Sequence, residues 1–350
     1  MLTGIIFFLV LSFLILIHEF GHFYVAKKSG MLVEEFGLGL PPRIWGKKIG
    51  ETLYSLNLLP FGGFVKIFGD NPDDLKKNPK ALKRAFNHKP WYQQLMVIVA
   101  GPTMNFLLAV LVISYLFTKG TYVPSNTVTV VEAQSGSPAK VAGLKKDDVI
   151  VSIAGKKVTT SEQLISIAKD KAGKPVMIII SRQGKEFQMQ ITPRQNPPKN
   201  QGALGAVITD LELKKYPLYQ APFVGLVESV RISLLFYKEL GSLFWQFITF
   251  QNPQVEVAGP VGIVQLTGKA VNYGYEAVIQ LLGLLSLNLA LINIIPFPAL
   301  DGGQISFIVF EQFTRKKIKE EIKARINVAG FAFLLFLLFL ITIKDVRSLF

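Results

Sequence analysis

The sequence predicts a polytopic α-helical membrane protein with four transmembrane helices, a membrane-associated β-hairpin and an inserted α+β domain. Half of the 350 residues are hydrophobic, and four long apolar runs with few charges are spaced along the chain. A bilayer-spanning helix needs about 20 apolar residues, which each run supplies or nearly supplies. The polar stretch between the second and third runs has the length of one domain, since domains typically hold about 100–150 residues.

The first span is predicted at residues 1–28 and contains the sequence HEFGH. Its start lacks Lys and Arg, and no small-residue cleavage site follows its apolar core. We therefore expect it to be retained rather than removed as a signal peptide. The other three spans are predicted at residues 92–118, 276–300 and 326–344.

Basic residues in the short loops predict the orientation of these spans. They cluster on both sides of the segment that joins the first two spans, and again in the loop 301–325: Lys27, Lys28, Arg43, Lys47, Lys48, Lys83, Arg84, Lys89, Arg315, Lys316, Lys317, Lys319, Lys323 and Arg325. Both loops should be cytoplasmic, which puts the inserted domain and both termini on the outer side. The net charge of +14 fits attraction to the lipid bilayer, and we expect no nucleic-acid partner.

A β-hairpin is predicted at about residues 51–69, within the cytoplasmic-side loop 29–91. Tyr54, Leu56 and Leu58 alternate with polar residues, as in a strand. The sequence PFGG then predicts a turn, and FVKIF a returning strand. Such a hairpin either lies passively on the membrane surface or offers its edge to an extended peptide by strand addition.

The inserted domain, residues 121–216, alternates strand-like runs with a turn-rich centre. The piece SPAKVAGLKKDDVI, which contains Asp148 and is followed by IAGKKV, resembles a PDZ domain of the bacterial protease-associated kind. The resemblance implies a peptide or chain-end ligand bound by strand addition. The alternative is a domain that only excludes bulky substrates as a steric filter.

The linker 217–275 is expected to hold an amphipathic helix that lies in the membrane interface. Apolar residues recur there at helical spacing, but Glu228, Arg231, Lys238 and Glu239 interrupt them. An interfacial helix fits this pattern better than a fifth span.

Three ionisable residues stand within the first span: His18, Glu19 and His22. Residues four apart share one face of a helix, so both imidazoles point the same way. This is the spacing by which two histidines hold one zinc ion, with the glutamate beside it. Ionisable residues inside a membrane are costly and usually functional, which favours a metal site over two core histidines.

The third ligand is expected to be a carboxylate. Catalytic zinc usually has three protein ligands, but the chain has no cysteine and its remaining histidine, His88, lies in a polar loop. Glu34, Glu35 and Glu51 are near in sequence. Asp301 fits better, because it closes the third span at the cytoplasmic side, where the two histidines also lie.

Further polar and helix-breaking residues surround this aspartate in sequence. Pro296 and Pro298 break the helix, which a membrane tolerates only where protein or a wet cavity satisfies the freed backbone. Asn288 and Asn293 can donate to a substrate carbonyl or to its oxyanion.

Together, HEFGH and the segment NIIPFPALDGG resemble the motifs of the site-2 protease family of intramembrane zinc metalloproteases. AGPTMNF, residues 100–106, is similar to that family's second-span motif, and PFGGFVKI to its membrane hairpin. One PDZ-like insert fits the bacterial regulator-of-sigma-E protease branch, although some members carry two. The resemblance covers essentially the whole chain.

The resemblance implies a zinc metalloendopeptidase of the bacterial cytoplasmic membrane with its active site near the cytoplasmic side. His18, His22 and Asp301 would bind Zn²⁺, and Glu19 would act as general base and then as general acid. The substrates would be single-pass transmembrane proteins, such as anti-sigma factors or remnant signal peptides.

A transmembrane substrate must unwind before cleavage, and its freed backbone groups then need partners. This favours strand addition over a passive hairpin. We therefore assign substrate positioning to residues of the hairpin turn and of the third span: Phe61, Gly62, Gly63, Asn288, Asn293, Pro296 and Pro298.

The main alternative is a transporter or a PDZ-bearing scaffold in which the metal is structural or absent. A transporter should show repeated halves, and the sequence shows no internal repeat. A scaffold has no need of Glu19. A protease that sits on the membrane and cuts soluble loops does not fit motifs placed this deep.

Overall fold

The computed structural model describes residues 2–69, 79–198, 201–249, 251 and 259–347. The chain divides into two compact units. One is formed by Met1–Thr118 together with Pro217–Phe350, and the other by Lys119–Tyr216.

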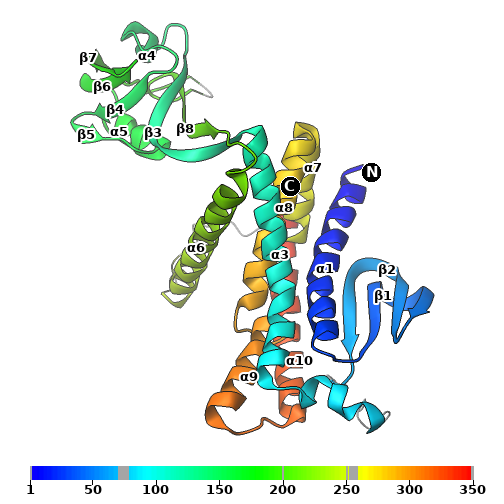
Figure 1. Ribbon diagram of the computed structural model, residues 1–350. Helices are drawn as coiled ribbons and strands as arrows, with labels where there is room; N and C mark the ends of the chain where they lie inside the picture. The colour runs from blue at the N-terminus through cyan, green and yellow to red at the C-terminus, as the bar shows by residue number, and fades with distance from the viewer. Residues whose placement is uncertain (1, 70–78, 199–200, 250, 252–258, 348–350) are drawn as a thin grey trace. The chain divides into compact units, whose positions relative to one another are not determined.

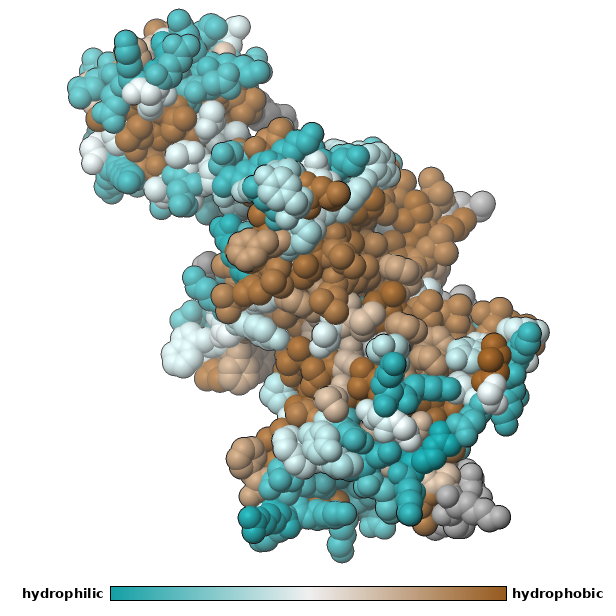
Figure 2. Space-filling view, in the orientation of Figure 1, coloured by the Kyte–Doolittle hydropathy of each residue, from teal (hydrophilic) through white to brown (hydrophobic). Residues whose placement is uncertain are grey.

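Among the described residues of the first unit, four helices are long and apolar enough to cross a membrane: α1 (Leu2–Lys28), α3 (Trp91–Lys119), α8 (Tyr275–Ile294) and α10 (Glu320–Arg347). Successive members of this set run in opposite directions (Figure 1). Hydrophobic side chains cover the middle of this bundle, and hydrophilic side chains gather at the end that holds α9 (Figure 2). This distribution is the one that a bilayer-embedded bundle requires.

The stretch 217–275 was predicted as a linker with an interfacial helix, and its described residues form two helices. α6 (Ala221–Ile248) is not among the candidate spans of the described residues. α7 (Pro260–Tyr273) packs against α1, α8 and α10 instead of lying apart from the bundle. The buried Asp345 of α10 holds the start of α7, since its Oδ2 accepts hydrogen bonds from the backbone N–H of Gly259 (3.0 Å) and Gly262 (2.8 Å).

The segment 301–325, expected as a loop, begins with a helix, α9 (Asp301–Thr314). Two physical reasons account for the difference. A carboxylate at Asp301 interacts favourably with the positive N-terminal end of a helix. The side chains of Ile305 and Ile308 join an apolar cluster that also contains residues of α1 and α3.

The predicted hairpin is part of a larger sheet formed by β1 (Val33–Ile49) and β2 (Thr52–Ile67). Residues Glu35–Leu38 of β1 pair with two parts of β2, Leu53–Leu56 and Gly63–Lys66. The two predicted hairpin strands are therefore not partners of each other, because part of β1 lies between them. Glycine and proline within residues 37–46 concealed β1 in the sequence, since both are rare in strand interiors.

Aromatic packing fixes this sheet against the end of α1 that carries HEFGH. The ring of Phe23 lies 5.0 Å from that of Phe36 and 5.9 Å from that of Tyr54, measured between centroids. An apolar cluster links α1, β1, α3, α9 and the 3₁₀ turn η2 (Phe86–His88), which follows η1 (Pro79–Arg84): Ala26, Met31, Val33, Phe86, Val97, Ile98 and Ile308. The sheet is thereby held beside the two histidines.

The described residues of the second unit form a sheet with two helices: β3 (Thr121–Ala133), α4 (Pro138–Val141), β4 (Val149–Ile153), β5 (Lys156–Lys157), α5 (Ser161–Asp170), β6 (Val176–Arg182), β7 (Lys185–Ile191) and β8 (Ala206–Lys214). The strand order is β7-β6-β4-β3-β8, with β5 paired to β4. Buried aliphatic side chains of the sheet, Leu164 and Ala168 of α5 and Ala139 of α4 form one core.

Asp148, the acidic residue noted in the sequence, is fully buried in this unit. Arg182 donates to both of its carboxylate oxygens, at 2.6 and 2.7 Å, and the backbone N–H of Lys145 donates at 2.8 Å. Burial opposes ionisation, but these hydrogen bonds outweigh it and hold the pKa of Asp148 below its ordinary value. The ion pair joins the loop before β4 to β6.

Candidate metal centre

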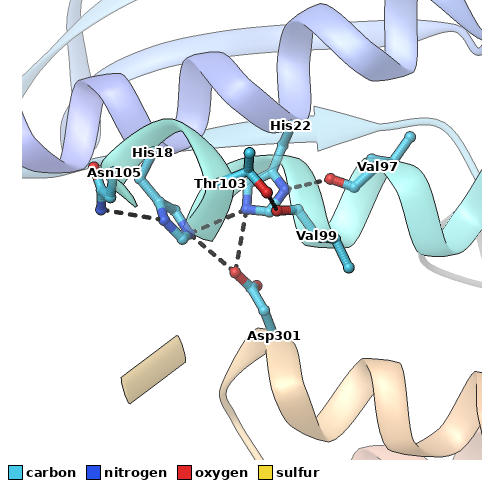
Figure 3. Close-up of polar contacts among 7 residues, drawn as sticks. All are labelled: His18, His22, Val97, Val99, Thr103, Asn105 and Asp301. Carbon is cyan, nitrogen blue, oxygen red and sulfur yellow. Dashed lines mark hydrogen bonds and ion pairs between the residues drawn. The ribbon is translucent and has the colours of Figure 1, made fainter. Parts of the chain in front are cut away.

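The two histidines of HEFGH lie one turn apart on the buried face of α1. HEFGH belongs to an uninterrupted helix, and Leu14, His18 and Gly21 form a buried stripe along it. The Nε2 atoms of His18 and His22 are 3.1 Å apart (Figure 3). The i, i+4 prediction is thus realised in the geometry of the rings.

Asp301 supplies the third group from the start of α9. Its Oδ2 lies 3.1 Å from Nε2 of His18 and 3.5 Å from Nε2 of His22. In the part of the chain that the structure describes, these three residues form a group whose ligand atoms all lie within 4.8 Å of one another. The aspartate preferred from the sequence is therefore the one that meets the histidines.

The three atoms fit a zinc ion. Ligand atoms about 2.0–2.1 Å from a tetrahedral zinc lie about 3.3–3.4 Å from one another, and the distances here are 3.1, 3.1 and 3.5 Å. Nδ1 of His22 lies 2.8 Å from the carbonyl of Val97, so it carries the proton and leaves Nε2 as a lone pair. Oδ2 of Asp301 is buried and faces these two imidazole nitrogens. A dication would satisfy all three acceptors.

The position of Asp301 follows from the way α8 ends. Pro296 and Pro298 prevent the helix from continuing past Ile294. Gly302 then lies against the carbonyls of the last turn of α8, and Gly303 against the carbonyl of Phe297, where any Cβ would overlap them. The Gly-Gly pair therefore lets the chain turn back sharply and present Asp301 to α1.

Helix α3 approaches α1 closely at the two histidines. A Cβ on Gly101 would overlap the imidazole of His22 and come within 2.8 Å of Nε2 of His18. A Cβ on Gly21 would overlap the carbonyl of Ala100. Sequence reasoning identified AGPTMNF only by resemblance and gave no role to these glycines. Small residues inside apolar spans, which allow helices to approach closely, were the available signal.

Glu19 lies beside the three ligand atoms. It is half-buried, interacts electrostatically with His18, His22 and Asp301, and accepts a hydrogen bond from the backbone of Val65. A Cβ placed on Gly63 would stand 3.5 Å from its Cγ. The returning part of β2 therefore runs next to the carboxylate.

The remaining predicted residues lie on α8, in the segment that follows it and on β2. Asn288 and Asn293 are half-buried on α8, and within the described residues neither side chain makes a hydrogen bond. Pro298 packs against Gly330 of α10. Gly62, with a φ of 81°, lies near Ile15 of α1.

Some candidates do not join the centre. Glu34, Glu35 and Glu51 face Lys66, Arg43 and Arg84, at 2.7, 4.0 and 2.6 Å, rather than the histidines. His88 is exposed on η2. The side chain of Phe61 lies outside the described residues.

Comparison with known proteins decides the family. The sequence profile of "Peptidase family M50" matches residues 6–337. The chain belongs to this family. This M50 peptidase is 34% identical over 344 residues to a putative zinc metalloprotease of Clostridium perfringens, covering 97% of this chain and 96% of that protein. It is 27% identical over 424 residues to the regulator of sigma-W protease RasP of Bacillus subtilis, covering 99% of each.

Membership confirms the predicted site-2 protease type, the zinc metalloendopeptidase activity and the use of zinc, and it favours the enzyme over a transporter or a scaffold.

Among solved structures, the PDZ domain of an SdrC-like protein from Listeria monocytogenes matches 26% of this M50 peptidase and 95% of that domain. The identity is 24% and the TM-score 0.23.

Proposed function

We propose that His18, His22 and Asp301 hold the catalytic Zn²⁺ of this M50 peptidase and that Glu19 is its general base. The observation that carries the proposal is the convergence of two imidazole nitrogens and one carboxylate oxygen at 3.1–3.5 Å, with Glu19 beside them. When bound, zinc supplies Lewis-acid activation of water and of the scissile carbonyl at neutral pH.

Side chains and backbone groups of the chain transfer the proton and hold the metal-binding side chains in place. Glu19 takes the proton of the attacking water and returns it to the leaving amine, which is the role of a general base that then acts as a general acid. The Val65 backbone hydrogen bond fixes the Glu19 carboxylate beside the site. The carbonyl of Val97 fixes the ring of His22.

The substrates are proposed to be single-pass transmembrane proteins, cleaved within or near their membrane segments. Residues Gly63–Lys66 pair with β1 along one edge, and in the described residues their other edge pairs with no strand. An unwound substrate added there would place its peptide bonds beside Glu19. Gly62 and Gly63 add no side chain to this edge, and Phe61 precedes them in β2.

Residues of α8 and of the segment that follows it are also proposed to position the substrate. The amides of Asn288 and Asn293 make no other hydrogen bond among the described residues, so they are free to donate to a substrate carbonyl or to the oxyanion. Pro296 and Pro298 end α8 and keep the connection to Asp301 in its bent form.

The unit Lys119–Tyr216 is proposed to be a PDZ domain that binds a peptide or chain end of the substrate, or filters substrates by size. Four spans, with this unit and both termini outside and the metal centre near the cytoplasmic side, are the proposed topology. The basic loops at the HEFGH end of α1 and between α9 and α10 support it.

Replacing Glu19 tests the proposal directly. Glu19→Gln keeps the shape of the side chain and all three ligands, so zinc content should stay at one per chain while cleavage of a reconstituted transmembrane substrate falls by at least about 10²–10⁴-fold. His22→Ala should lose the metal itself. Cleavage at the wild-type rate by Glu19→Gln would remove Glu19 from the mechanism and favour a non-catalytic metal.

A further inference from the structure

One face of α3 lies against the Nδ1 atoms of His18 and His22, the ring nitrogens that do not face Asp301. Val97, Gly101 and Asn105 follow at intervals of four residues and so share this face. The carbonyl of Val97 takes the Nδ1 proton of His22, and Gly101 leaves room for both rings. Beyond Gly101, the side-chain amide nitrogen of Asn105 lies 3.5 Å from Nδ1 of His18 (Figure 3).

The tautomer of His18 determines what this contact must be. A ring that binds metal through Nε2 carries its proton on Nδ1, which therefore needs an acceptor. An amide nitrogen facing Nδ1 suits the opposite tautomer, whose Nε2 is protonated and cannot bind metal. In that orientation Oδ1 of Asn105 is also buried, and no described residue donates a hydrogen bond to it. A half-turn of the carboxamide exchanges its two ends and brings Oδ1 to Nδ1.

We propose that Asn105 is the positioning residue of His18. Its Oδ1 accepts the hydrogen bond of Nδ1–H and so fixes the tautomer and the ring plane that aim Nε2 at His22 and Asp301. Asn105 is fully buried, and its own carbonyl accepts a 2.8 Å hydrogen bond from Ser286 of α8, which fixes this turn of α3. Asn105 thus accepts from Nδ1–H of His18 in the same way as the carbonyl of Val97 accepts from Nδ1–H of His22. It rests on the proposed zinc site.

Zinc affinity of the full chain in detergent micelles tests this role without reference to cleavage. The affinity is measured by competition with a chromophoric chelator. Asn105→Leu keeps the volume of the side chain but removes the acceptor. It should weaken zinc binding by about 10–100-fold, which is the typical cost of losing a hydrogen bond to the second ring nitrogen of a metal-binding histidine. Asn105→Asp retains an acceptor and should bind zinc at least as tightly as the wild type.

A matched control lies on the same helix. Thr103 is exposed, and its hydroxyl donates to the carbonyl of Val99 within α3, at 2.8 Å (Figure 3). Thr103→Val should leave zinc affinity unchanged. If Asn105→Leu fails to fold, as judged by the melting temperature of the metal-free protein, Asn105→Ala takes its place.

The outcomes separate this inference from the site on which it rests. Wild-type affinity in Asn105→Leu, or equal weakening in the Leu and Asp variants, would overturn the positioning role. Asp301→Asn and His22→Ala are measured alongside. If these two also keep wild-type affinity, the proposed zinc site itself is wrong. If they lose zinc while Asn105→Leu keeps it, only the role of Asn105 fails.

Discussion

The metal centre requires a residue without a side chain at position 101, where α3 carries Gly101. A Cβ there would overlap His22 and crowd His18, both held in place by α1. Gly101→Ala should therefore displace the rings, lower zinc content below one per chain and abolish cleavage. Metal analysis of the purified protein checks the first effect. Gly4→Ala in α1 is the matched control, because a Cβ at Gly4 meets nothing within 4 Å. Full zinc occupancy in Gly101→Ala would show that α3 can retreat from α1.

The same residues show what sequence can and cannot reveal at this scale. His18 and His22 were predictable because their meeting depends only on helix periodicity. Asp301 was predictable because the end of a span fixes its depth in the membrane. Gly101 and Asn105 meet the histidines through the approach of a second helix, which no local spacing encodes. These contacts were therefore visible only when α3 was placed beside α1.

At the scale of elements, β2 has two tasks that one substitution can separate. The backbone N–H of Val65 meets Glu19, and the neighbouring edge is proposed to receive substrate. Val65→Pro removes this N–H and should lower kcat by about tenfold or more while zinc content stays at one per chain. Val65→Ala keeps the N–H and is the control. Equal losses in both variants would point to the side chain of Val65 instead of its backbone.

The sheet also marks where prediction from sequence failed. The strand-like alternation around Tyr54 correctly identified part of β2, but pairing was inferred from adjacency in sequence. The actual partner, Glu35–Leu38, enters from β1 and separates the two halves. Strand order depends on tertiary contacts such as Phe23 with Phe36, so alternation alone could not reveal it.

In the second unit, the buried Asp148–Arg182 pair should make stability depend on pH. The pKa of Asp148 is lowered in the folded state, so its contribution is present above the unfolded value of about 3.9 and is lost as pH falls through the lower folded value. Asp148→Asn should destabilise this unit by about 1.5–3 kcal/mol at pH 7, as expected for hydrogen bonds to a charged group.

Hydrogen exchange of amides in β4 and β6, followed in the full chain, measures that loss. The difference between the wild type and Asp148→Asn should shrink as the pH falls below about 4. Lys171→Gln, which changes an exposed charge of the same unit, is the control. A difference that is the same at pH 7 and at low pH would mean that the carboxylate charge does not contribute.

At the scale of the whole molecule, the proposed topology makes a prediction that the composition of the chain makes easy to test. The protein has no cysteine, so single cysteines can be introduced one at a time. Lys171 is exposed in the second unit, and Lys316 is exposed between α9 and α10. Because basic loops stay in the cytoplasm, Lys171→Cys should react with a membrane-impermeant maleimide in intact spheroplasts. Lys316→Cys should react only after permeabilisation. If Lys316→Cys reacted from outside, the proposed orientation would be wrong, and the metal centre would lie near the outer surface.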